Sequence, residues 1–195
     1  MDKLNLATSS LVESARTQQQ FLRFRLLPDL TALIEIDRIA GTKDVESERR
    51  RHIQVTELVN IQIDRVVPMP HLPPGVMGVY NWRGEILWIV DLAMLLGVTK
   101  GRRYRSLQPT IILASSTEQR GKAIGEERQE QTIGLVVDEI AEIEWYEPEQ
   151  IRPLEQRLAA LSTWVRGVWA AVTGENFLVV DGQAIFDRPD FDADV

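Results

Sequence analysis

Two pairs of segments in this chain repeat each other in the same order, and this repeat constrains the fold more than any other feature. Residues 31–40 read TALIEIDRIA and residues 132–141 read TIGLVVDEIA, so threonine, aspartate, isoleucine and alanine recur in register. Residues 84–91 and 174–181 both begin with Gly-Glu and end with Val-Asp. Matches in a conserved order along one chain predict a duplicated structure.

A further match lies upstream of each Gly-Glu segment, where residues 78–80 (Gly-Val-Tyr) resemble residues 167–169 (Gly-Val-Trp). The matches divide the chain into halves of about residues 20–100 and 108–188. Each half is too small to bury a sufficient core alone. We therefore expect two small β-barrels that pack against each other and leave a groove at their join.

The apolar residues alternate as they do in β-strands. Leu22, Phe24 and Leu26 alternate with two arginines, which predicts one buried and one solvated face. Residues 86–90 carry no polar side chain, so we expect a strand that is buried on both faces. Similar apolar segments predict strands at residues 31–39, 59–63, 110–114, 133–137, 140–145, 165–172 and 177–180. The pattern predicts a mainly β fold with a few short helices.

Several short segments have the residues of turns and helix caps. The Arg-Gly dipeptide at residues 83–84 predicts a hairpin turn. Asp91 is a suitable N-cap for a short helix over residues 92–96, and Gly97 suits the position after its C-terminus. Four prolines in residues 67–75 predict an extended connection, because proline has no N–H to donate within a sheet.

Three segments are too polar for any face to be buried. Residues 41–52 predict a solvated loop or an exposed helical turn, and residues 115–131 predict a long polar loop. Residues 100–105 contain four basic side chains and predict a solvated linker between the two subdomains. Four basic side chains in one loop do not predict nucleic-acid binding, which usually needs a broader basic surface with stacking aromatic rings.

The composition excludes several classes of site. The chain has 195 residues, a net charge of -7 and no cysteine. It therefore forms no disulfide, zinc–thiolate site or iron–sulfur cluster, and its charge does not attract nucleic acid. No apolar run approaches the roughly 18 residues of a membrane span, and residues 1–20 do not resemble a targeting signal. We expect a cytoplasmic protein that binds no nucleic acid and does not insert into membranes.

Candidate catalytic groups are few. The nucleophile-elbow, P-loop and dinucleotide-binding glycine motifs are absent, and the two histidines, His52 and His71, lie in polar or proline-rich segments. Six carboxylates cluster in the second half, at Asp138, Glu139, Glu142, Glu144, Glu147 and Glu149. They suit the solvated face of a strand, although such a stripe could also meet a basic partner or serve general acid–base chemistry. We expect no catalytic residue, cofactor or metal.

One long motif resembles a known family. Residues 76–92, VMGVYNWRGEILWIVDL, resemble the central signature of CheW-like domains. Residues 134–138 and 148–153 resemble a later signature of the same family. The resemblance extends over about residues 20–188, so residues 1–19 are expected to be a polar leader and residues 189–195 an acidic tail.

The resemblance implies a CheW-like fold of two intertwined, five-stranded β-barrels with short helices and no catalysis. It implies an adaptor that couples the cytoplasmic tip of a methyl-accepting chemoreceptor to the regulatory domain of a CheA-type histidine kinase. A receptor helix would dock in an apolar groove between the barrels. The hairpin motif is similar to PilI and PixI types, which implies control of type IV pilus motility, either twitching or phototactic.

The family's receptor contacts carry over to Gly78, Asn81, Trp82, Arg83 and Gly84. Trp82 stands where the family often has leucine. Arg83 either contacts the receptor or braces its own turn by pairing with a carboxylate. The resemblance assigns no kinase-binding residues.

The charged segment at residues 41–52 is an insertion relative to the family pattern, and we expect it to influence the choice of partner. Two other functions are consistent with the residues. The chain could be a β-barrel module for another helical partner, or a hydrolase that uses its acidic cluster.

Overall fold

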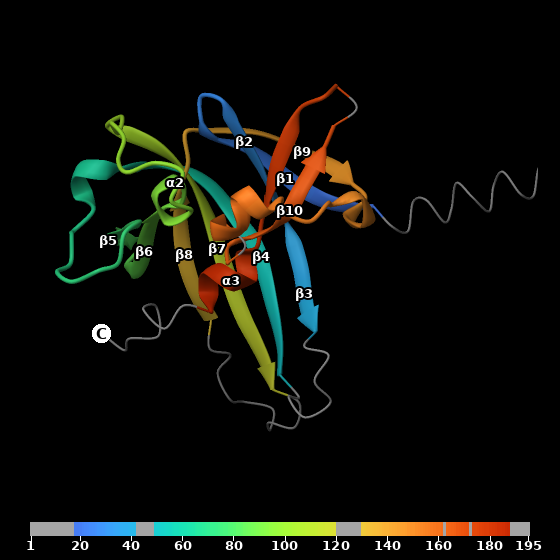
Figure 1. Ribbon diagram of the computed structural model, residues 1–195. Helices are drawn as coiled ribbons and strands as arrows, with labels where there is room; N and C mark the ends of the chain where they lie inside the picture. Colours follow the sequence, from blue (N-terminus) through green and yellow to red (C-terminus); the bar gives the residue numbers. More distant parts are fainter. Residues whose placement is uncertain (1–17, 42–48, 120–129, 162, 172, 188–195) are drawn as a thin grey trace, which may run out of the picture.

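The computed structural model describes residues 18–41, 49–119, 130–161, 163–171 and 173–187, and these form two packed β-sheets (Figure 1). The expected polar leader and acidic tail lie almost entirely outside these ranges. Sheet A has the strand order β10 (Val165–Ala170), β11 (Asn176–Val180), β2 (Leu30–Glu35), β1 (Gln19–Leu27) and β9 (Glu139–Tyr146). Sheet B has the order β5 (Val76–Trp82), β6 (Glu85–Asp91), β8 (Glu130–Val136), β7 (Leu107–Gln119), β4 (Arg49–Gln62) and β3 (Asp37–Gly41).

Short helices connect the strands. The α-helices are α2 (Leu92–Leu95) and α3 (Gly182–Phe186), and the 3-10 helices are η1 (Ile63–Arg65), η2 (Pro148–Gln150) and η3 (Gln156–Leu161). The predicted mainly β, CheW-like architecture with short helices is confirmed. The two units are curled sheets of five and six strands rather than closed five-stranded barrels.

The repeated segments occupy equivalent places in the two sheets. In sheet A, β2 pairs in parallel with β11, and Ala32 lies opposite Leu178. In sheet B, β8 pairs in parallel with β6, and Ile133 lies opposite Trp88. Ala32 aligns with Ile133 in the repeat, and Leu178 aligns with Trp88, so the two parallel pairs are equivalent. In each sheet, one strand of the parallel pair comes from each half of the chain. The six-stranded sheet differs by one added strand, because β4 lies between β7 and β3.

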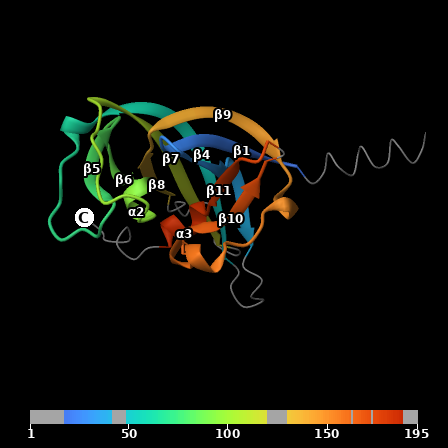
Figure 2. The same ribbon diagram turned by 45° about the horizontal axis from the view of Figure 1, so that its top comes forward.

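Each repeated segment passes from one sheet to the other at its aspartate. β2 ends at Glu35 in sheet A and β3 starts at Asp37 in sheet B. Between them, Ile36 donates its N–H to Gln20 O of sheet A and accepts from Val55 N of sheet B. The second repeat crosses in the opposite direction, from β8 to β9, which runs alongside β1 across the top of Figure 2. The crossing divides the single strand that we expected at residues 31–39 into two.

The apolar side chains of the two sheets form three clusters. The central core lies between the sheets and includes Phe24 and Ile34 of sheet A with Leu113 and Leu135 of sheet B. Cluster A covers the other face of sheet A, with the members Phe21, Leu33, Tyr146, Phe177 and Val179. Cluster B covers the other face of sheet B, with the members Ile61, Leu87, Ile89, Ile112 and Val136. Strands of both sheets are therefore buried on both faces, as predicted for residues 86–90, although Ile86 at the hairpin end is exposed.

Two of the predicted polar loops are shorter than expected. β4 begins at Arg49 and pairs with β7 as far as Gln119, and β8 begins at Glu130. Residues 42–48 and 120–129 lie outside the described residues. The loop predictions for residues 49–52, 115–119 and 130–131 are wrong, because a long antiparallel ladder satisfies backbone N–H and C=O groups even where neither face is apolar.

In each sheet, an isolated β-bridge joins an edge strand to an extended connection. Val67 pairs with Val79 of β5, and Arg152 pairs with Val168 of β10. A glycine next to each bridge permits this approach. A Cβ on Gly78 would lie 2.0 Å from Val67 O, and a Cβ on Gly167 would lie 2.2 Å from Arg152 O.

Replacing Gly167 by alanine tests this constraint without a change in the sign of φ. We expect Gly167→Ala to lower the free energy of unfolding by about 1–3 kcal/mol, because the added methyl group overlaps a backbone carbonyl. Urea denaturation measures the change. Gly101→Ala is the matched control, since that Cβ would meet no atom within 4 Å. Equal stability of the two variants would contradict the steric account.

Candidate functional site

The motif at residues 76–92 forms a tight hairpin between β5 and β6. Arg83 and Gly84 occupy its two turn positions, with φ values of 56° and 91°. Positive φ at both positions is typical of the two-residue turn whose twist suits an antiparallel pair. The Asn81 side chain accepts a hydrogen bond from Gly84 N through Oδ1 at 3.1 Å. The predicted hairpin turn is confirmed, and Asn81 stabilises it.

Arg83 pairs with a carboxylate on a distant strand. Its Nη1 and Nη2 donate to Oε1 and Oε2 of Glu57 on β4, at 2.7 and 2.9 Å. Its guanidinium also lies 5.0 Å from the centre of the Trp82 ring. The side chain of Arg83 is nevertheless 68% exposed. The bracing contact is therefore present, and the guanidinium keeps N–H donors that face solvent.

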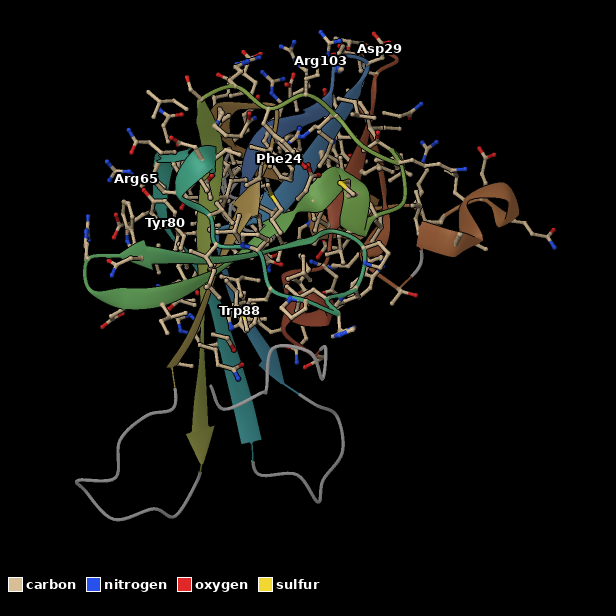
Figure 3. All side chains as sticks on the ribbon, turned by 90° about the vertical axis from the view of Figure 1, so that its left-hand side faces the viewer. Phe24, Asp29, Arg65, Tyr80, Trp88 and Arg103 are labelled. Carbon is tan, nitrogen blue, oxygen red and sulfur yellow. The ribbon has the colours of Figure 1, made fainter. Side chains whose placement is uncertain are left out.

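The other motif residues differ in their exposure. Trp82 is half-buried and packs with Tyr80 against cluster B, while Trp88 of β6 packs on the central core. In Figure 3, Tyr80 and Trp88 lie on opposite sides of the hairpin ribbon. Gly78 is buried and has φ of 137°, so it acts through its backbone and offers no side chain to a partner.

Apolar side chains also reach the surface on the faces that carry the central core, opposite to the face on which Arg83 meets Glu57. Leu58 on β4 pairs with Ile111, and Ile143 on β9 pairs with Leu22. Paired residues share a face, so both side chains lie on the faces that carry the central core. Leu58, Ile143 and Trp145 are 44%, 53% and 58% exposed. We call these three residues the apolar margin.

The apolar margin lies along the join of the two sheets. β9 also contacts β7, which is the neighbour of β4, so the two strands lie on the same side of the molecule. The central core fills the space between the sheets, and the expected apolar groove is therefore not an open cleft between them. The acidic residues of segment 140–145 dominate its sequence and do not reveal the margin. The alternate apolar residues of that strand were the available signal.

Asp91 lies at the centre of a buried polar cluster. It is fully buried, and its Oδ1 accepts from Met94 N at 3.0 Å, so the predicted helix cap is confirmed. Its Oδ2 accepts from Arg102 Nε at 2.8 Å and from the Tyr104 hydroxyl at 2.9 Å. Arg102 also donates to Leu26 O of β1, which links sheet B to sheet A.

This cluster corrects the prediction for residues 100–105 at Arg102 and Tyr104, whereas Lys100, Arg103 and Arg105 are exposed as expected. We expected a solvated linker, but the Arg102 side chain is only 11% exposed. Burial, together with the neighbouring Asp91 carboxylate, raises the pKa of Tyr104 to about 12. The hydroxyl therefore remains protonated at neutral pH and donates to Asp91. The sequence could not reveal this, because the partner of Arg102 lies eleven residues away.

The acidic residues of the second half do not form a catalytic pair. Glu139 pairs with Arg25 at 2.7 Å, and Glu144 pairs with Arg23 at 3.2 Å. Glu142 also pairs with Arg23, and Asp138 lies 3.6 Å from Arg105. Within the described residues no group of three histidine, aspartate or glutamate side chains could hold a metal ion. These exposed ion pairs do not favour the hydrolase alternative, which requires buried carboxylates.

Replacing Arg83 and Glu57 shows whether Arg83 mainly stabilises the hairpin or mainly remains available to a partner protein. We expect Arg83→Ala to lower the free energy of unfolding by less than about 1 kcal/mol, because exposed ion pairs contribute little. A double-mutant cycle with Glu57→Ala should give a coupling of about 0.2–1 kcal/mol. A much larger loss would assign Arg83 mainly to the stability of the hairpin.

Replacing Asp91 should have a far larger effect. We expect Asp91→Ala to cost about 3–5 kcal/mol, because Arg102 would remain buried without its counter-ion. Thermal and urea denaturation measure the loss, and Asp64→Ala, at an exposed position in η1, is the control. Asp91→Ala combined with Arg102→Met should cost less than the sum of the two single changes. Strict additivity would contradict the coupling.

No helix among the described residues is both long and apolar enough to cross a membrane.

Similarity to known proteins agrees with the fold. The crystal structure of the scaffolding protein TtCheW from Thermoanaerobacter tengcongensis superposes with a TM-score of 0.59 at 19% sequence identity. The match covers 88% of this chain and 90% of that one.

Two sequence relatives have the same description. The chain is 28% identical over 127 residues to a chemotaxis protein CheW of Rhizobium meliloti (strain 1021), covering 65% of this chain and 72% of that protein. It is 28% identical over 126 residues to a probable chemotaxis protein CheW of Rhizobium etli, covering 64% and 72%. The model of the CheW-like domain family matches residues 52–190, which is more than half of the chain. The chain therefore belongs to the CheW-like family of non-catalytic chemotaxis adaptors.

Proposed function

We propose that this adaptor couples the cytoplasmic tip of a methyl-accepting chemoreceptor to the regulatory domain of a CheA-type histidine kinase. The observation that carries the proposal is the position of Arg83. It lies exposed at the tip of the β5–β6 hairpin and is held there by Glu57 of β4. The apolar margin is a separate feature, because Leu58 follows Glu57 in β4 and lies on the opposite face of sheet B. Its exposed apolar side chains suit the apolar face of an amphipathic helix.

The physical roles of the two parts are distinct. Leu58, Ile143 and Trp145 would supply the apolar anchors, since a few large side chains usually dominate the binding energy of an interface. Arg83 would fix the orientation of the helix by donating to a carboxylate of the receptor. The Trp82 ring and the Glu57 carboxylate hold the guanidinium in place, so little side-chain entropy is lost on binding.

The remaining partners and the pathway rest on the family resemblance. The kinase would bind through its own barrel-like regulatory domain, in the cytoplasm. The hairpin sequence Asn81-Trp82-Arg83-Gly84-Glu85 is similar to pilus-associated members of the family. We therefore propose a role in type IV pilus motility, twitching or phototactic, and co-purification from the native cell would identify the kinase and the receptor.

Binding to a receptor-tip fragment tests the coupling role. We expect Leu58→Asp and Ile143→Asp each to weaken binding at least tenfold, about 1.4 kcal/mol, because each places a charge in the apolar contact. Arg83→Ala should weaken receptor binding while leaving the protein folded. Isothermal titration calorimetry measures the affinities.

Leu107→Asp is the matched control, because Leu107 is 53% exposed in the same β4–β7 ladder and pairs with Gln62, four residues along β4 from Leu58. The control should bind the receptor fragment normally. Equal losses in all three Asp variants would contradict the assigned surface. Absence of binding by the unmodified protein to both receptor and kinase would contradict the proposed function and favour another helical partner.

A further inference from the structure

In the second half of the chain, a leucine-rich connection covers the core-side face of the β10–β11 hairpin. This connection runs from Arg152, which bridges to Val168, through η3 to the start of β10. Val168 lies opposite Leu178, and both side chains belong to or pack on the central core. The large apolar side chains of the connection belong to or pack on the same core, namely Leu154, Leu158, Leu161 and Trp164. The chain therefore buries this face with a segment of its own.

The equivalent connection in the first half gives no such cover. It runs from Val67, which bridges to Val79, to the start of β5. Residues 68–75 form it, so it is shorter than the connection of residues 153–164, and its four prolines suit an extended chain. The structure describes all of these residues and shows no helix among them. Its large apolar side chains, Met69 and Leu72, belong to none of the three apolar clusters.

The core-side face of the β5–β6 hairpin carries exposed apolar side chains. Val67 lies opposite Val79, and Val79 lies opposite Trp88, so the three share one face. Ile86 lies two residues before Trp88 in β6 and is on the same face. Val67 and Ile86 are 60% and 62% exposed, and Val79 is half-buried. We call Val67, Val79, Ile86 and Trp88 the hairpin patch. Because Trp88 packs on the central core, the patch continues the apolar interface between the two sheets.

The hairpin patch differs from the aligned surface of sheet A. Ile86 aligns with Asn176, which is exposed at the equivalent end of β11. A polar side chain suits that solvated position, whereas an exposed isoleucine beside exposed valine forms a patch of the kind that marks an interaction surface. β5 and β6 form one end of sheet B, and β4 with Leu58 lies toward the other end. The hairpin patch is therefore separate from the apolar margin.

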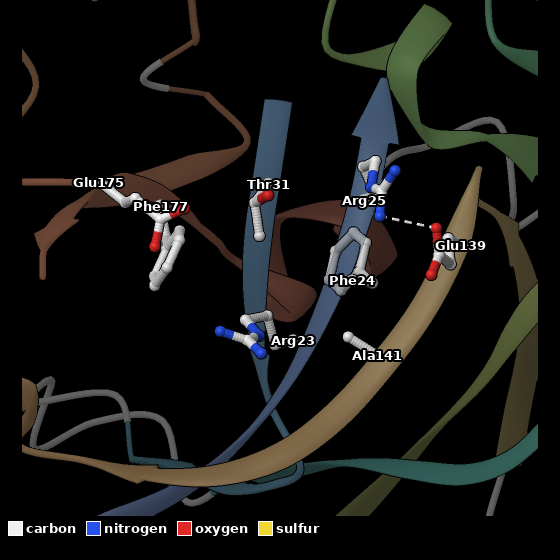
Figure 4. A pocket seen from close by; sticks show the side chains of 8 residues that line it. All are labelled: Arg23, Phe24, Arg25, Thr31, Glu139, Ala141, Glu175 and Phe177. Atoms are coloured by element: carbon white, nitrogen blue, oxygen red, sulfur yellow. Dashed lines mark ion pairs between the residues drawn. The ribbon is translucent and has the colours of Figure 1, made fainter. Parts of the chain in front are cut away.

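The face of sheet A that is turned away from the central core is polar instead. A shallow cavity of about 210 Å³ lies there, and its charged lining residues are Arg23, Arg25, Glu139 and Glu175 (Figure 4). Arg25 pairs with Glu139 at 2.7 Å. Two guanidinium groups thus balance two carboxylates, and this surface differs in kind from the apolar hairpin patch of sheet B.

We propose that the hairpin patch binds a short helical segment of a partner protein that carries two leucines three residues apart. The connection through η3 is the internal example of such a contact, since its Leu158 and Leu161 have this spacing and pack on the core with the β10–β11 hairpin. Residues three apart share one face of a helix, so both leucines can pack on Val79 and Trp88. Val67 and Ile86 would flank this contact and exclude water from it.

A titration of the full-length protein with a synthetic peptide tests the proposal. The probe is the peptide PLEQRLAALSTW, which has the sequence of residues 153–164 and so carries the leucines that cover sheet A. We expect saturable NMR amide shifts centred on Val67 and on residues 76–82 and 85–90. The same peptide with serine in place of Leu158 and Leu161 should bind at least about tenfold more weakly, because it loses two apolar anchors.

Substitutions in the protein locate the contact. Ile86→Asp should weaken binding of the leucine peptide at least about tenfold, because it places a charge in the apolar contact. Asn176→Asp, at the aligned position of sheet A, is the matched control and should leave binding unchanged. Val67→Asp is a second variant, and spectra without peptide show whether each variant is folded. Ile86→Asp should bind the receptor-tip fragment normally, so failure of this test leaves the proposed coupling role untouched.

Several results would overturn the proposal. Equal binding of the serine peptide, unchanged binding in the folded Ile86→Asp and Val67→Asp variants, or an absence of shifts at millimolar peptide would each do so. Shifts confined to β10 and β11 would mean that the peptide only displaces its own counterpart there. Self-association that Ile86→Asp abolishes would assign the patch to a second copy of the chain. Peptide binding only after removal of residues 188–195 would assign the patch to that segment.

Discussion

The parallel pairing of strands from the two halves is the constraint on which the rest of the structure depends. β6 of the first half pairs with β8 of the second, and β2 of the first pairs with β11 of the second. Parallel pairs need a long connection, and here residues 92–129 connect β6 to β8 and residues 36–175 connect β2 to β11. Sheet A needs strands from residues 19–35 and from residues 139–180, and sheet B needs strands from both halves, so neither half can complete a sheet alone.

The same exchange positions the candidate receptor surface. The chain crosses from sheet B to sheet A at Asp138, so β9 of sheet A contacts β7 of sheet B. This crossing brings Ile143 and Trp145 to the join. The hairpin is fixed from two directions, by the Val67–Val79 bridge and by the Arg83–Glu57 ion pair. An adaptor needs this rigidity, since a flexible contact would lose entropy on binding and transmit less of a partner's movement.

The halves have diverged in a way that suits an adaptor with more than one partner. Sheet B packs apolar side chains on the face away from the central core, whereas the aligned positions of sheet A carry ion pairs and a cavity. A duplicated framework can keep its backbone pairing while each copy acquires its own surface chemistry. The shared hydrogen-bond register preserves the fold, and the side chains on the outer faces determine what each half can bind.

Residues close together in the chain were enough to predict the centres of most strands, the hairpin turn at Arg83-Gly84, the cap at Asp91 and the family. Only the tertiary structure revealed the partners of Arg83 and Arg102, the ladder that extends β4 to Arg49, and the exposure of Leu58, Ile143 and Trp145. These features depend on contacts between distant segments. Local periodicity shows which face of a strand is apolar, but it does not show whether another sheet covers that face.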